Sequence, residues 1–327
     1  MLRRTFVSIG MVLLAAAVQA ADSKQPAFTN PVEAGPDFEL QGEYSGECKM
    51  NGESKMTGVQ VIALGDGKFR AMGLVGGLPG AGWSRGDEVR MSEGKLTDDT
   101  VSFTDGDIRA ELKAGVISVL DGGNEIGKLA KVHRQSPTLG QKPPTGAVVL
   151  FDGSSADKFE NGKLVEEKLL AASNCVSKQK FGDHSLHIEF RTPFMPKSTG
   201  QGRGNSGVYL QSRYELQVLD SFGLEGKNNE CGGIYTIAEP RVNMCFPPLA
   251  WQTYDIDYVQ AKYDDAGKKT KNARVTVKHN GVTIHEDLEI PRGTPGRAPE
   301  GPSPEGIFLQ DHGNPVVFRN IWVAEKK

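Results

Sequence analysis

The sequence predicts an all-β protein with two domains. Short runs of alternating polar and apolar residues recur along most of the chain, and turn dipeptides separate them. No long helical pattern interrupts these runs, and a segment rich in proline and glycine divides them. Beyond an N-terminal leader the chain has roughly 307 residues, whereas single cores rarely grow past about 250–300.

The N-terminus has the pattern of a secretory signal peptide, expected over residues 1–20. Arg3 and Arg4 precede a mainly apolar run that is too short to cross a bilayer, and Ala20 supplies a small residue for cleavage. The next residue is Ala21 and not a cysteine, so no lipid anchor is expected there. The sequence therefore predicts an exported protein, periplasmic or secreted, that does not insert into the membrane.

The charge balance argues against nucleic acid as a partner. The chain carries 38 basic and 41 acidic residues, a formal net charge of −3, and it has no basic patch. A nucleotide-binding loop is not expected either, because the glycine-rich segment 76–82 lacks the Gly-Lys-Ser/Thr ending of a phosphate loop.

Residues 21–135 are expected to form a small antiparallel sheet or barrel. Turn signals at residues 65–67, 105–106 and 121–124 separate short runs of strand-forming residues. The role of this domain is left open, with attachment to a polymer or a partner as one alternative. Residues 136–146 follow as the linker, because the prolines and glycines there disfavour a helix or a strand.

Residues 147–327 are expected to form a second β domain. Residues 185–191 and 251–259 alternate polar and apolar side chains, and the Asn-Gly pair at residues 280–281 is a strong hairpin signal. A run of strands without a long helix favours a β-sandwich.

Four cysteines in an exported chain permit up to two disulfides. Cys231 and Cys245 lie close together in one loop-rich region, so we expect them to be bonded, which would stabilise the fold by about 3 kcal/mol in the chain-entropy model. Cys48 and Cys175 fall in different domains, and a bridge between them has weaker support.

The stretch from Asn205 to Asp220 has an unusual polar face. Apolar residues at positions 208, 210, 216 and 218 share one parity and are expected in the core. The opposite parity, with a short turn near residues 212–213, gathers Tyr209, Gln211, Arg213, Glu215 and Gln217. An aromatic ring, two amides, a guanidinium and a carboxylate are the chemistry of a sugar site. The alternative, a solvated strand face, would more often carry Lys, Thr and Ser.

Seven segments of the C-terminal domain, in this order, form a specific pattern. They are 150–153 (Leu-Phe-Asp-Gly), 205–211 (Asn-Ser-Gly-Val-Tyr-Leu-Gln), 214–220 (Tyr-Glu-Leu-Gln-Val-Leu-Asp), 231–235 (Cys-Gly-Gly-Ile-Tyr), 251–255 (Trp-Gln-Thr-Tyr-Asp), 309–313 (Leu-Gln-Asp-His-Gly) and 318–322 (Phe-Arg-Asn-Ile-Trp). Together they resemble the 3-keto-disaccharide hydrolase family, which implies a jelly-roll sandwich of the concanavalin A type. The chain departs from the family at Phe159, where a tryptophan is common, and its N-terminal domain lies outside the resemblance.

The resemblance implies an enzyme that cleaves the glycosidic bond of 3-keto-glycosides or 3-keto-disaccharides, by hydrolysis or by elimination with later hydration. A ketone at C3 acidifies the C2 proton, so a modest base can remove it and expel the group at C1. Such a site needs a base, donors for the enolate and an acid for the leaving oxygen. It does not need the two flanking carboxylates of ordinary glycosidases.

Glu215 is the leading catalytic carboxylate, and a salt bridge to Arg213 is its alternative role. Asp220 is a further candidate, although its parity is wrong unless the strand has a bulge. His312 lies in the loop before the last strand and is the second proton-transfer candidate, with Asp311 expected to orient it. For His312, the alternative is a surface residue held by its neighbour.

Other residues are expected to bind the substrate. Gln217, like Tyr209 and Gln211, should contact a hydroxyl, and Arg213 could stabilise an enolate or carbonyl oxygen through its planar donors. Tyr235 and Trp251 are candidates for stacking on a sugar face, although either could belong to the core.

No cofactor is firmly expected. His312, Asp311, Glu215 and Asp220 would supply enough donors for a divalent ion such as calcium, but their spacing is not compact. A small sugar is the expected partner, and the oligomeric state is left open. The alternative function is a lectin-like module that holds glycans without cleaving them. Such a module could lose Glu215 and keep its affinity, so this residue distinguishes the two.

Overall fold

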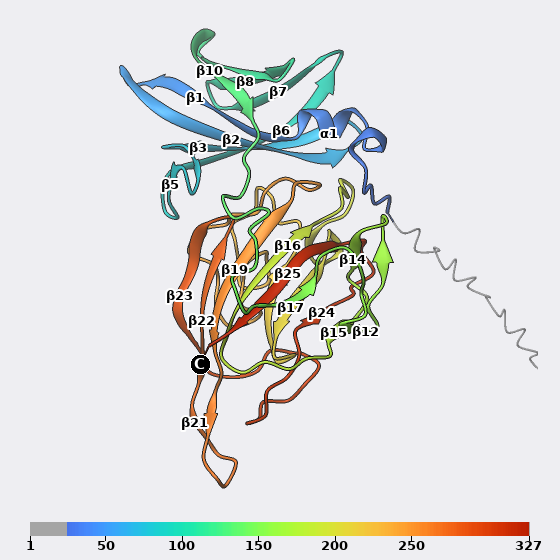
Figure 1. Cartoon of the computed structure of the whole chain (residues 1–327). Coiled ribbons are helices and arrows are strands. Elements are labelled where there is room, and N and C mark those ends of the chain that lie inside the picture. The colour runs from blue at the N-terminus through green and yellow to red at the C-terminus, as the bar shows by residue number, and fades with distance from the viewer. Residues whose placement is uncertain (1–24, 327) are drawn as a thin grey trace, which may run out of the picture.

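The computed structural model describes residues 25–326 of the chain. The expected signal peptide, residues 1–20, therefore lies outside the described residues. Strands make up nearly all of the regular structure, so the predicted all-β fold is confirmed (Figure 1). None of the helices in the described part is long and apolar enough to cross a membrane.

The N-terminal part is a closed antiparallel barrel, preceded by the 3-10 helix η1 (Pro31–Glu33) and the helix α1 (Pro36–Leu40). Around the barrel the strand order is β1-β10-β9-β8-β7-β6-β3-β2. These strands are β1 (Gly42–Met50), β2 (Glu53–Gly65), β3 (Lys68–Val75), β6 (Val89–Thr97), β7 (Thr100–Asp105), β8 (Ile108–Lys113), β9 (Val116–Asp121) and β10 (Asn124–Val132). Two short strands, β4 (Leu78–Pro79) and β5 (Gly82–Trp83), pair beside the barrel.

Large side chains fill the interior of this barrel, as is usual for a barrel of eight strands. Tyr44, Phe69, Phe103, Leu112 and Leu129 are all buried in one cluster. The alternation of buried and exposed positions along β7 and β9 follows from the two-residue period of a strand.

The C-terminal part is a sandwich of two antiparallel sheets. The larger sheet contains β11 (Val148–Phe151), β13 (Leu164–Val165), β14 (Leu169–Ala171), β16 (His184–Arg191), β19 (Gln252–Val259), β22 (Ala273–His279), β23 (Val282–Ile290) and β25 (Val317–Glu325). The smaller sheet, in spatial order, contains β12 (Phe159–Glu160), β15 (Cys175–Ser177), β24 (Phe308–Leu309), β17 (Ser206–Leu210) and β18 (Tyr214–Val218).

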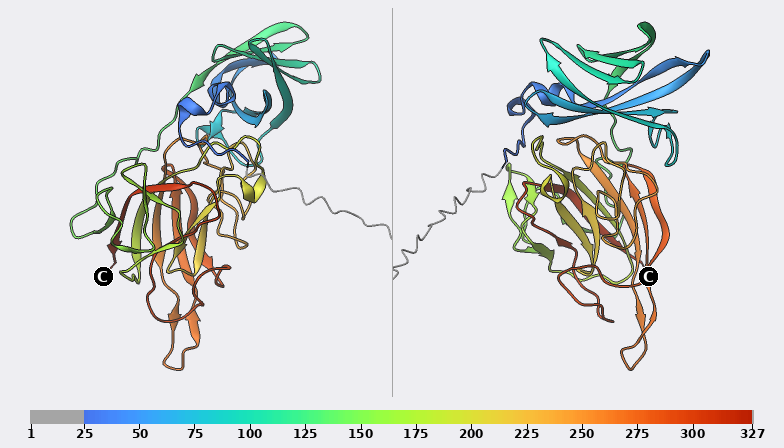
Figure 2. Two further views of the ribbon diagram at one scale, coloured as in Figure 1. Left: turned by 90° about the vertical axis from the view of Figure 1, so that its right-hand side faces the viewer. Right: turned by 180° about the vertical axis from the view of Figure 1, so that it is seen from behind.

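Two further elements lie outside these sheets. The 3-10 helix η2 (Gly200–Gly202) precedes β17. Strands β20 (Lys262–Tyr263) and β21 (Lys269–Lys271) form a hairpin that projects from the end of the sandwich remote from the barrel (Figure 2).

The sandwich core lies between the two sheets. Val208, Leu210, Leu216 and Val218 are buried in it together with Ile256 of the larger sheet, as their parity predicts. The opposite side of the smaller sheet carries a separate small cluster made of Val176, Tyr209 and Phe308. This outer face therefore has its own packed surface, which positions the polar residues of β17 and β18.

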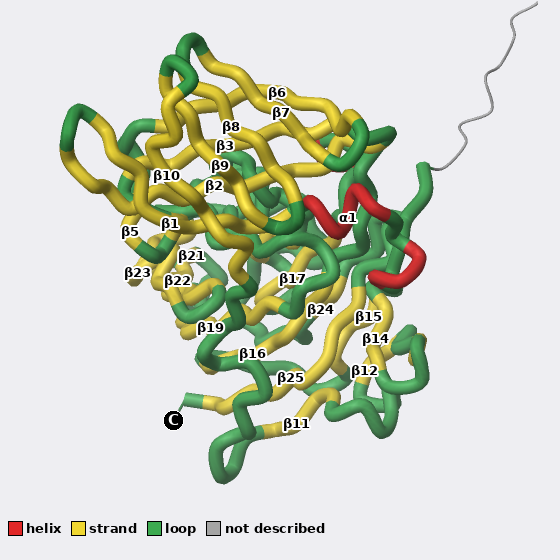
Figure 3. The backbone as a smooth tube through the Cα atoms, turned by 90° about the horizontal axis from the view of Figure 1, so that it is seen from above, coloured by secondary structure: helices red, strands yellow, loops and turns green. Residues whose placement is uncertain are grey.

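The barrel packs against one end of the sandwich (Figure 3). The backbones of Phe28 and Phe194 exchange two hydrogen bonds of 2.9 Å. Arg85 donates to the carbonyl oxygens of Gly226 (2.8 Å) and Pro240 (3.0 Å). Ile62 of β2 is buried in the core cluster of the sandwich, so apolar contacts as well as hydrogen bonds join the two parts.

The segment predicted as the linker is bound to the outer face of the larger sheet. Thr138 donates through its hydroxyl to Asp255 (2.6 Å), and the Gly140 backbone N–H donates to Glu189 Oε1 (2.6 Å). Trp322 Nε1 donates to the carbonyl oxygen of Gln141 at 3.2 Å. Because these buried and half-buried side chains are bonded to the linker, the outer face of the larger sheet is occupied at this point.

Candidate functional site

An open hollow of about 490 Å³ lies on the outer face of the smaller sheet. Two loops and the strand β24 form its rim and walls. Its lining residues are Asn174, Tyr209, Phe308, residues 295–297 and residues 310–312. The hollow thus brings together segments that are spread between residues 174 and 312 of the chain.

The hairpin of β17 and β18 places Tyr209 directly opposite Glu215. The carboxyl group of Glu215 lies over Gly207, where a Cβ atom would come within 2.6 Å of Glu215 Oε1. Glycine at position 207 therefore leaves the space that the carboxyl group occupies. The Glu215 backbone is also held, because its N–H donates to Thr294 Oγ1 at 2.9 Å.

Glu215 is a buried carboxyl group without a cationic partner. Its exposed fraction is 3%, and it takes part in no ion pair among the described residues, so the alternative salt bridge to Arg213 does not form. Burial raises the pKa of Glu215 from 4.5 to about 7, and a hydrogen bond from the Tyr209 hydroxyl opposes that rise. A carboxyl group with this pKa can both accept and release a proton near neutral pH.

Glu215 does not itself line the hollow, but Tyr209, its neighbour on the facing strand, does. Its hydroxyl lies 3.2 Å from the Pro295 carbonyl oxygen, so it can donate either to that oxygen or to Glu215, and it accepts from Gln310 Nε2 at 3.1 Å. Burial is the main cause that raises the pKa of Tyr209, which keeps the hydroxyl protonated. Gln310 Oε1 is buried without a partner and can still accept a hydrogen bond.

Gln217 shares the outward parity of Glu215, and its exposed fraction is 1%. Its Nε2 donates to Asn205 Oδ1 at 2.9 Å, whereas its Oε1 has no partner among the described residues. Burying an acceptor without a partner costs about 1–3 kcal/mol. The free Oε1 can still accept a hydrogen bond, but Gln217 is not among the residues that line the hollow.

His312 and Asp311 are exposed at the rim of the hollow. Asp311 Oδ1 accepts from the Gly313 backbone N–H at 2.7 Å, so this carboxylate shapes its own loop rather than bonding to His312. Tyr235 is half-buried beside the site, and its backbone N–H donates to the Glu215 carbonyl oxygen at 3.1 Å. Tyr235 also makes a small electrostatic contribution to the raised pKa of Tyr209.

Gln211 and Arg213, both expected at the site, serve the turn and a neighbouring loop instead. Gln211 Nε2 donates to the Phe181 carbonyl oxygen (2.8 Å), and Gln211 Oε1 accepts from Tyr258 (3.0 Å). Arg213 donates to the carbonyl oxygens of Pro299 (2.7 Å) and Ser303 (2.9 Å). Their buried polar groups are thus already bonded to protein and are not available for a substrate.

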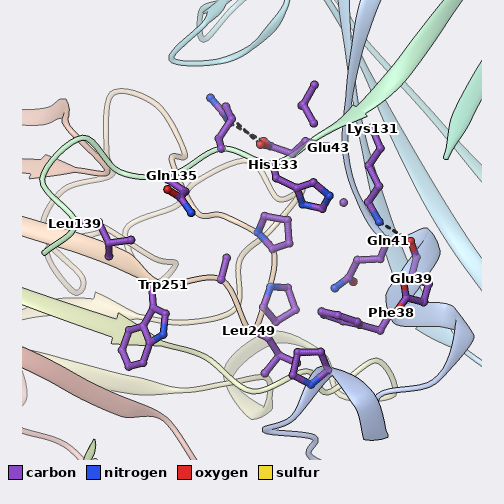
Figure 4. A pocket seen from close by; sticks show the side chains of 17 residues that line it. Phe38, Glu39, Gln41, Glu43, Lys131, His133, Gln135, Leu139, Leu249 and Trp251 are labelled. Atoms are coloured by element: carbon purple, nitrogen blue, oxygen red, sulfur yellow. Dashed lines mark hydrogen bonds and ion pairs between the residues drawn. The ribbon is translucent and has the colours of Figure 1, made fainter. Parts of the chain in front are cut away.

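Asp220 and Trp251 were also expected at the site and lie elsewhere. Asp220 is buried against Arg203, with 2.6 Å between Arg203 Nε and Asp220 Oδ2. Trp251 precedes β19 of the larger sheet, lines a cavity next to the barrel (Figure 4), and has the Arg319 guanidinium 3.9 Å from its ring centroid. Asp220 is thus part of a structural ion pair. The ring of Trp251, where a sugar was expected to stack, is in contact with a cation.

The suggested metal ligands are not brought together. Asp220 is committed to Arg203, and within residues 25–326 no group of three or more His, Cys, Asp or Glu side chains is arranged to hold a metal ion.

The expected disulfide between Cys231 and Cys245 is not formed. Both residues are buried as free thiols, and they are close enough to hydrogen bond to each other. Each sulfur also has another partner, since Cys231 Sγ lies 3.2 Å from the Tyr254 hydroxyl and Cys245 donates to the Leu219 carbonyl oxygen. The loop-rich region therefore brings the two cysteines together as thiols that fill the core.

Three residues of the hollow were not singled out from the sequence as binding residues. Gln310 and Phe308 have the outward parity on either side of the buried Leu309, but β24 is too short for this alternation to be recognised. Arg297 lies in an irregular loop, and its guanidinium sits 5.7 Å from the Phe308 ring centroid. Nothing in the local pattern around Arg297 could have shown this contact.

Comparisons with known proteins identify a family that the C-terminal part of the chain matches. Residues 146–324 match the model of the 3-keto-alpha-glucoside-1,2-lyase-like domain. A solved structure of a proposed glycosyl hydrolase from Parabacteroides distasonis is 32% identical, with a TM-score of 0.51, and the match covers 56% of this chain and 85% of that one. A second such protein from the same organism is 17% identical, with a TM-score of 0.40, covering 56% and 94%. No curated protein matches this chain.

The family model and the first of these structures confirm the resemblance seen in the sequence, and they agree with the sandwich fold. The segment matched by the family model begins after the barrel, which lies outside it.

The buried Glu215 gives a prediction for stability. Its pKa is raised on folding, so ionising it costs folding free energy, and wild type should lose this stability as pH rises from about 4.5 to about 7. Glu215→Gln removes the charge at nearly constant shape. The free energy of unfolding of this variant should therefore exceed that of wild type by an amount that grows over this pH range. The difference should reach about 3 kcal/mol at pH 8, since one pKa unit is worth about 1.4 kcal/mol. Urea unfolding at pH 5 and pH 8 measures this difference.

The matched control is Glu286→Gln, because Glu286 is an exposed glutamate paired with Arg241 on the surface. This variant should show little change between the two pH values. An equal effect of both substitutions at pH 8 would mean that Glu215 titrates as an ordinary surface carboxyl group.

Proposed function

Because this chain belongs to the 3-keto-alpha-glucoside-1,2-lyase-like family, we propose that it cleaves the glycosidic bond of 3-keto-glycosides or 3-keto-disaccharides. The coarser assignment, a carbohydrate-active enzyme of the glycosyl hydrolase or lyase type, rests on the family and on the neighbouring structures. The observation that carries the finer proposal is Glu215, a buried carboxyl group without a cation, whose pKa of about 7 suits a base for a C2 proton.

In the first step the Glu215 carboxylate takes the C2 proton, and the electron pair of the C2–H bond forms an enolate with its negative charge on O3. Donors at the hollow stabilise that oxygen. The protonated Tyr209 hydroxyl and the Gln310 amide N–H are already near Glu215, and the Arg297 guanidinium lines the wall. Fixed donors of this kind act where charge develops in the transition state.

In the second step the enolate electrons form the C1–C2 double bond as the C1–O bond breaks, and the leaving oxygen takes a proton from His312. The product is an unsaturated 3-keto sugar. If water then adds at C1 and a proton returns to C2, the net reaction is hydrolysis; otherwise it is elimination. The exposed position of His312 at the rim supports its role on the side where the leaving group departs.

The proposal includes export of the protein to the periplasm or the medium. Two arginines, a short apolar run and Ala20 support it. Expression of the full chain in a Gram-negative host, followed by N-terminal sequencing of the exported product, should give Ala21 as the first residue. Protein that stays in the cytoplasm with Met1 intact would exclude export.

Activity should depend on the ketone and on Glu215. A 3-keto-glucoside should be cleaved whereas the unoxidised glucoside is not. With a 4-nitrophenyl 3-keto-glucoside, whose leaving group needs no proton from His312, kcat/KM should rise with pH through a midpoint near 7, because the carboxylate form of Glu215 is the base. Glu215→Gln should lower kcat/KM by about 100-fold or more. Tyr209→Phe should move the midpoint to higher pH, since it removes the hydrogen bond that opposes the raised pKa.

Glu286→Gln is again the control and should behave as wild type, because this residue is exposed and lies on β23 of the larger sheet, whereas Glu215 lies on the smaller sheet. Sugar binding without any turnover of the keto substrate would favour the lectin-like alternative. A Glu215→Gln variant with wild-type kcat/KM would remove Glu215 from the mechanism.

The role of His312 can be tested with leaving groups of different acidity. His312→Asn should lower kcat at least about 100-fold for a 3-keto-disaccharide, whose leaving alcohol needs a proton. The same variant should lose little with a 4-nitrophenyl 3-keto-glucoside, because nitrophenolate leaves without protonation. Steady-state kinetics with both substrates give the comparison. Equal losses for the two substrates would show that His312 acts on binding or on loop structure instead.

A further inference from the structure

A second cavity lies where the barrel meets the sandwich, and it shares no lining residue with the hollow at Tyr209. Its volume is about 330 Å³ (Figure 4). The barrel side contributes Phe38, Gln41, Lys131 and His133, and the sandwich side contributes residues 247–251. A cavity of this size at a junction between domains is a common location for a small ligand.

Lys131 carries a positive charge at this cavity, and no carboxylate is paired with that charge in the described part of the chain. Its ammonium group donates to the Glu39 carbonyl oxygen and lies 5.9 Å from the Tyr44 ring centroid, and among the described residues it forms no ion pair. The side chain passes over Gly42, where a Cβ atom would meet Lys131 Cε at 2.9 Å. Burial lowers the pKa of Lys131, and the exposed Glu39 carboxylate offsets only part of that effect.

Gln41 brings an unpaired donor to the same side of the cavity. Gln41 Oε1 accepts from the Ala63 backbone N–H at 3.2 Å, which fixes the orientation of the amide. Gln41 Nε2 is buried and has no partner. Figure 4 shows this nitrogen turned toward the interior of the cavity, on the side where Lys131 and His133 also lie. A buried donor without an acceptor costs stability unless a ligand supplies one.

Apart from the exposed Glu39, the carboxylate that lines the cavity is already neutralised. Arg134 holds Glu43 through two hydrogen bonds of 2.6 Å, and Gln60 also donates to that carboxylate. Among the buried polar atoms that line the cavity, the one left without a partner is therefore a donor, Gln41 Nε2. The apolar part of the wall includes Phe38, Leu249 and the prolines at 247 and 248.

From this arrangement we infer a second binding site, for a small organic carboxylate with a compact apolar body. One carboxylate oxygen accepts from Gln41 Nε2 and Lys131 Nζ, and the apolar body packs against Phe38, Leu249 and the proline rings. A carboxylate satisfies the buried amide donor and the cation together, which a neutral ligand does not. Because both parts of the chain line the cavity, the ligand contacts the barrel and the sandwich at once.

Isothermal titration of the full mature chain tests this inference with three probes: phenylacetate, gluconate and the neutral phenylacetamide. Phenylacetate should bind saturably, and phenylacetamide and gluconate should bind at least about tenfold more weakly, because the first lacks the charge and the second lacks the apolar body. Lys131→Met and Gln41→Leu should each weaken phenylacetate binding at least about tenfold. Near-ultraviolet circular dichroism checks that both variants are folded.

Lys128→Met is the matched control, since Lys128 lies on the same strand β10 but is exposed and paired with Glu125. It should bind phenylacetate as wild type does. The inference fails if phenylacetate shows no saturable binding up to millimolar concentration, or if folded Lys131→Met and Gln41→Leu bind it as tightly as wild type. Tighter binding of gluconate or phenylacetamide would overturn the assigned ligand class. All these outcomes are independent of keto-sugar cleavage.

Discussion

The tight turn between β17 and β18 fixes the geometry on which the candidate site depends. Gln211 and Ser212 have φ angles of +50° and +54°, which non-glycine residues adopt rarely. Their side chains hold this conformation, because the Gln211 amide bonds to Phe181 and the Ser212 hydroxyl donates to the Gly306 carbonyl oxygen. The turn sets Tyr209 opposite Glu215. A shift of one residue in β18 would turn Glu215 into the core and Leu216 outward.

Glu215 differs from the other buried carboxylates of the protein. Glu43, Glu189 and Asp220 each have an arginine partner, at 2.6, 2.7 and 2.6 Å. Removing such a partner from a buried carboxylate typically costs 3–5 kcal/mol, so these pairs are consistent with structural roles. Glu215 has only the Tyr209 hydroxyl as a polar side-chain partner, and its ionised form is correspondingly unfavourable. A group that lowers stability in this way and sits beside an open hollow is a strong candidate for proton transfer.

The sequence pattern predicted the parts of the site that depend on strand parity. The two-residue period places Tyr209, Glu215 and Gln217 on the outer face and Leu216 in the core, as observed. It failed for Arg213 because the carbonyl oxygens of Pro299 and Ser303, which bind the guanidinium, come from a loop distant in sequence. The same limit applies to Arg297 and Gln310, whose positions depend on long-range packing. The all-β fold itself was predictable, because alternation and turn signals recur along the whole chain.

Asp220 takes part in a connection between the barrel and the candidate site. The barrel itself lies outside the family match. Arg203 bonds to Asp220 through Nε at 2.6 Å, and its Nη1 lies 3.5 Å from the carbonyl oxygen of Ala63 in the barrel. Asp220 is two residues beyond the end of β18, the strand that carries Glu215. One buried guanidinium therefore joins the barrel to the end of this strand. Asp220, the further catalytic candidate from the sequence, is therefore better understood as a positioning residue. It holds Arg203 where both parts of the chain meet.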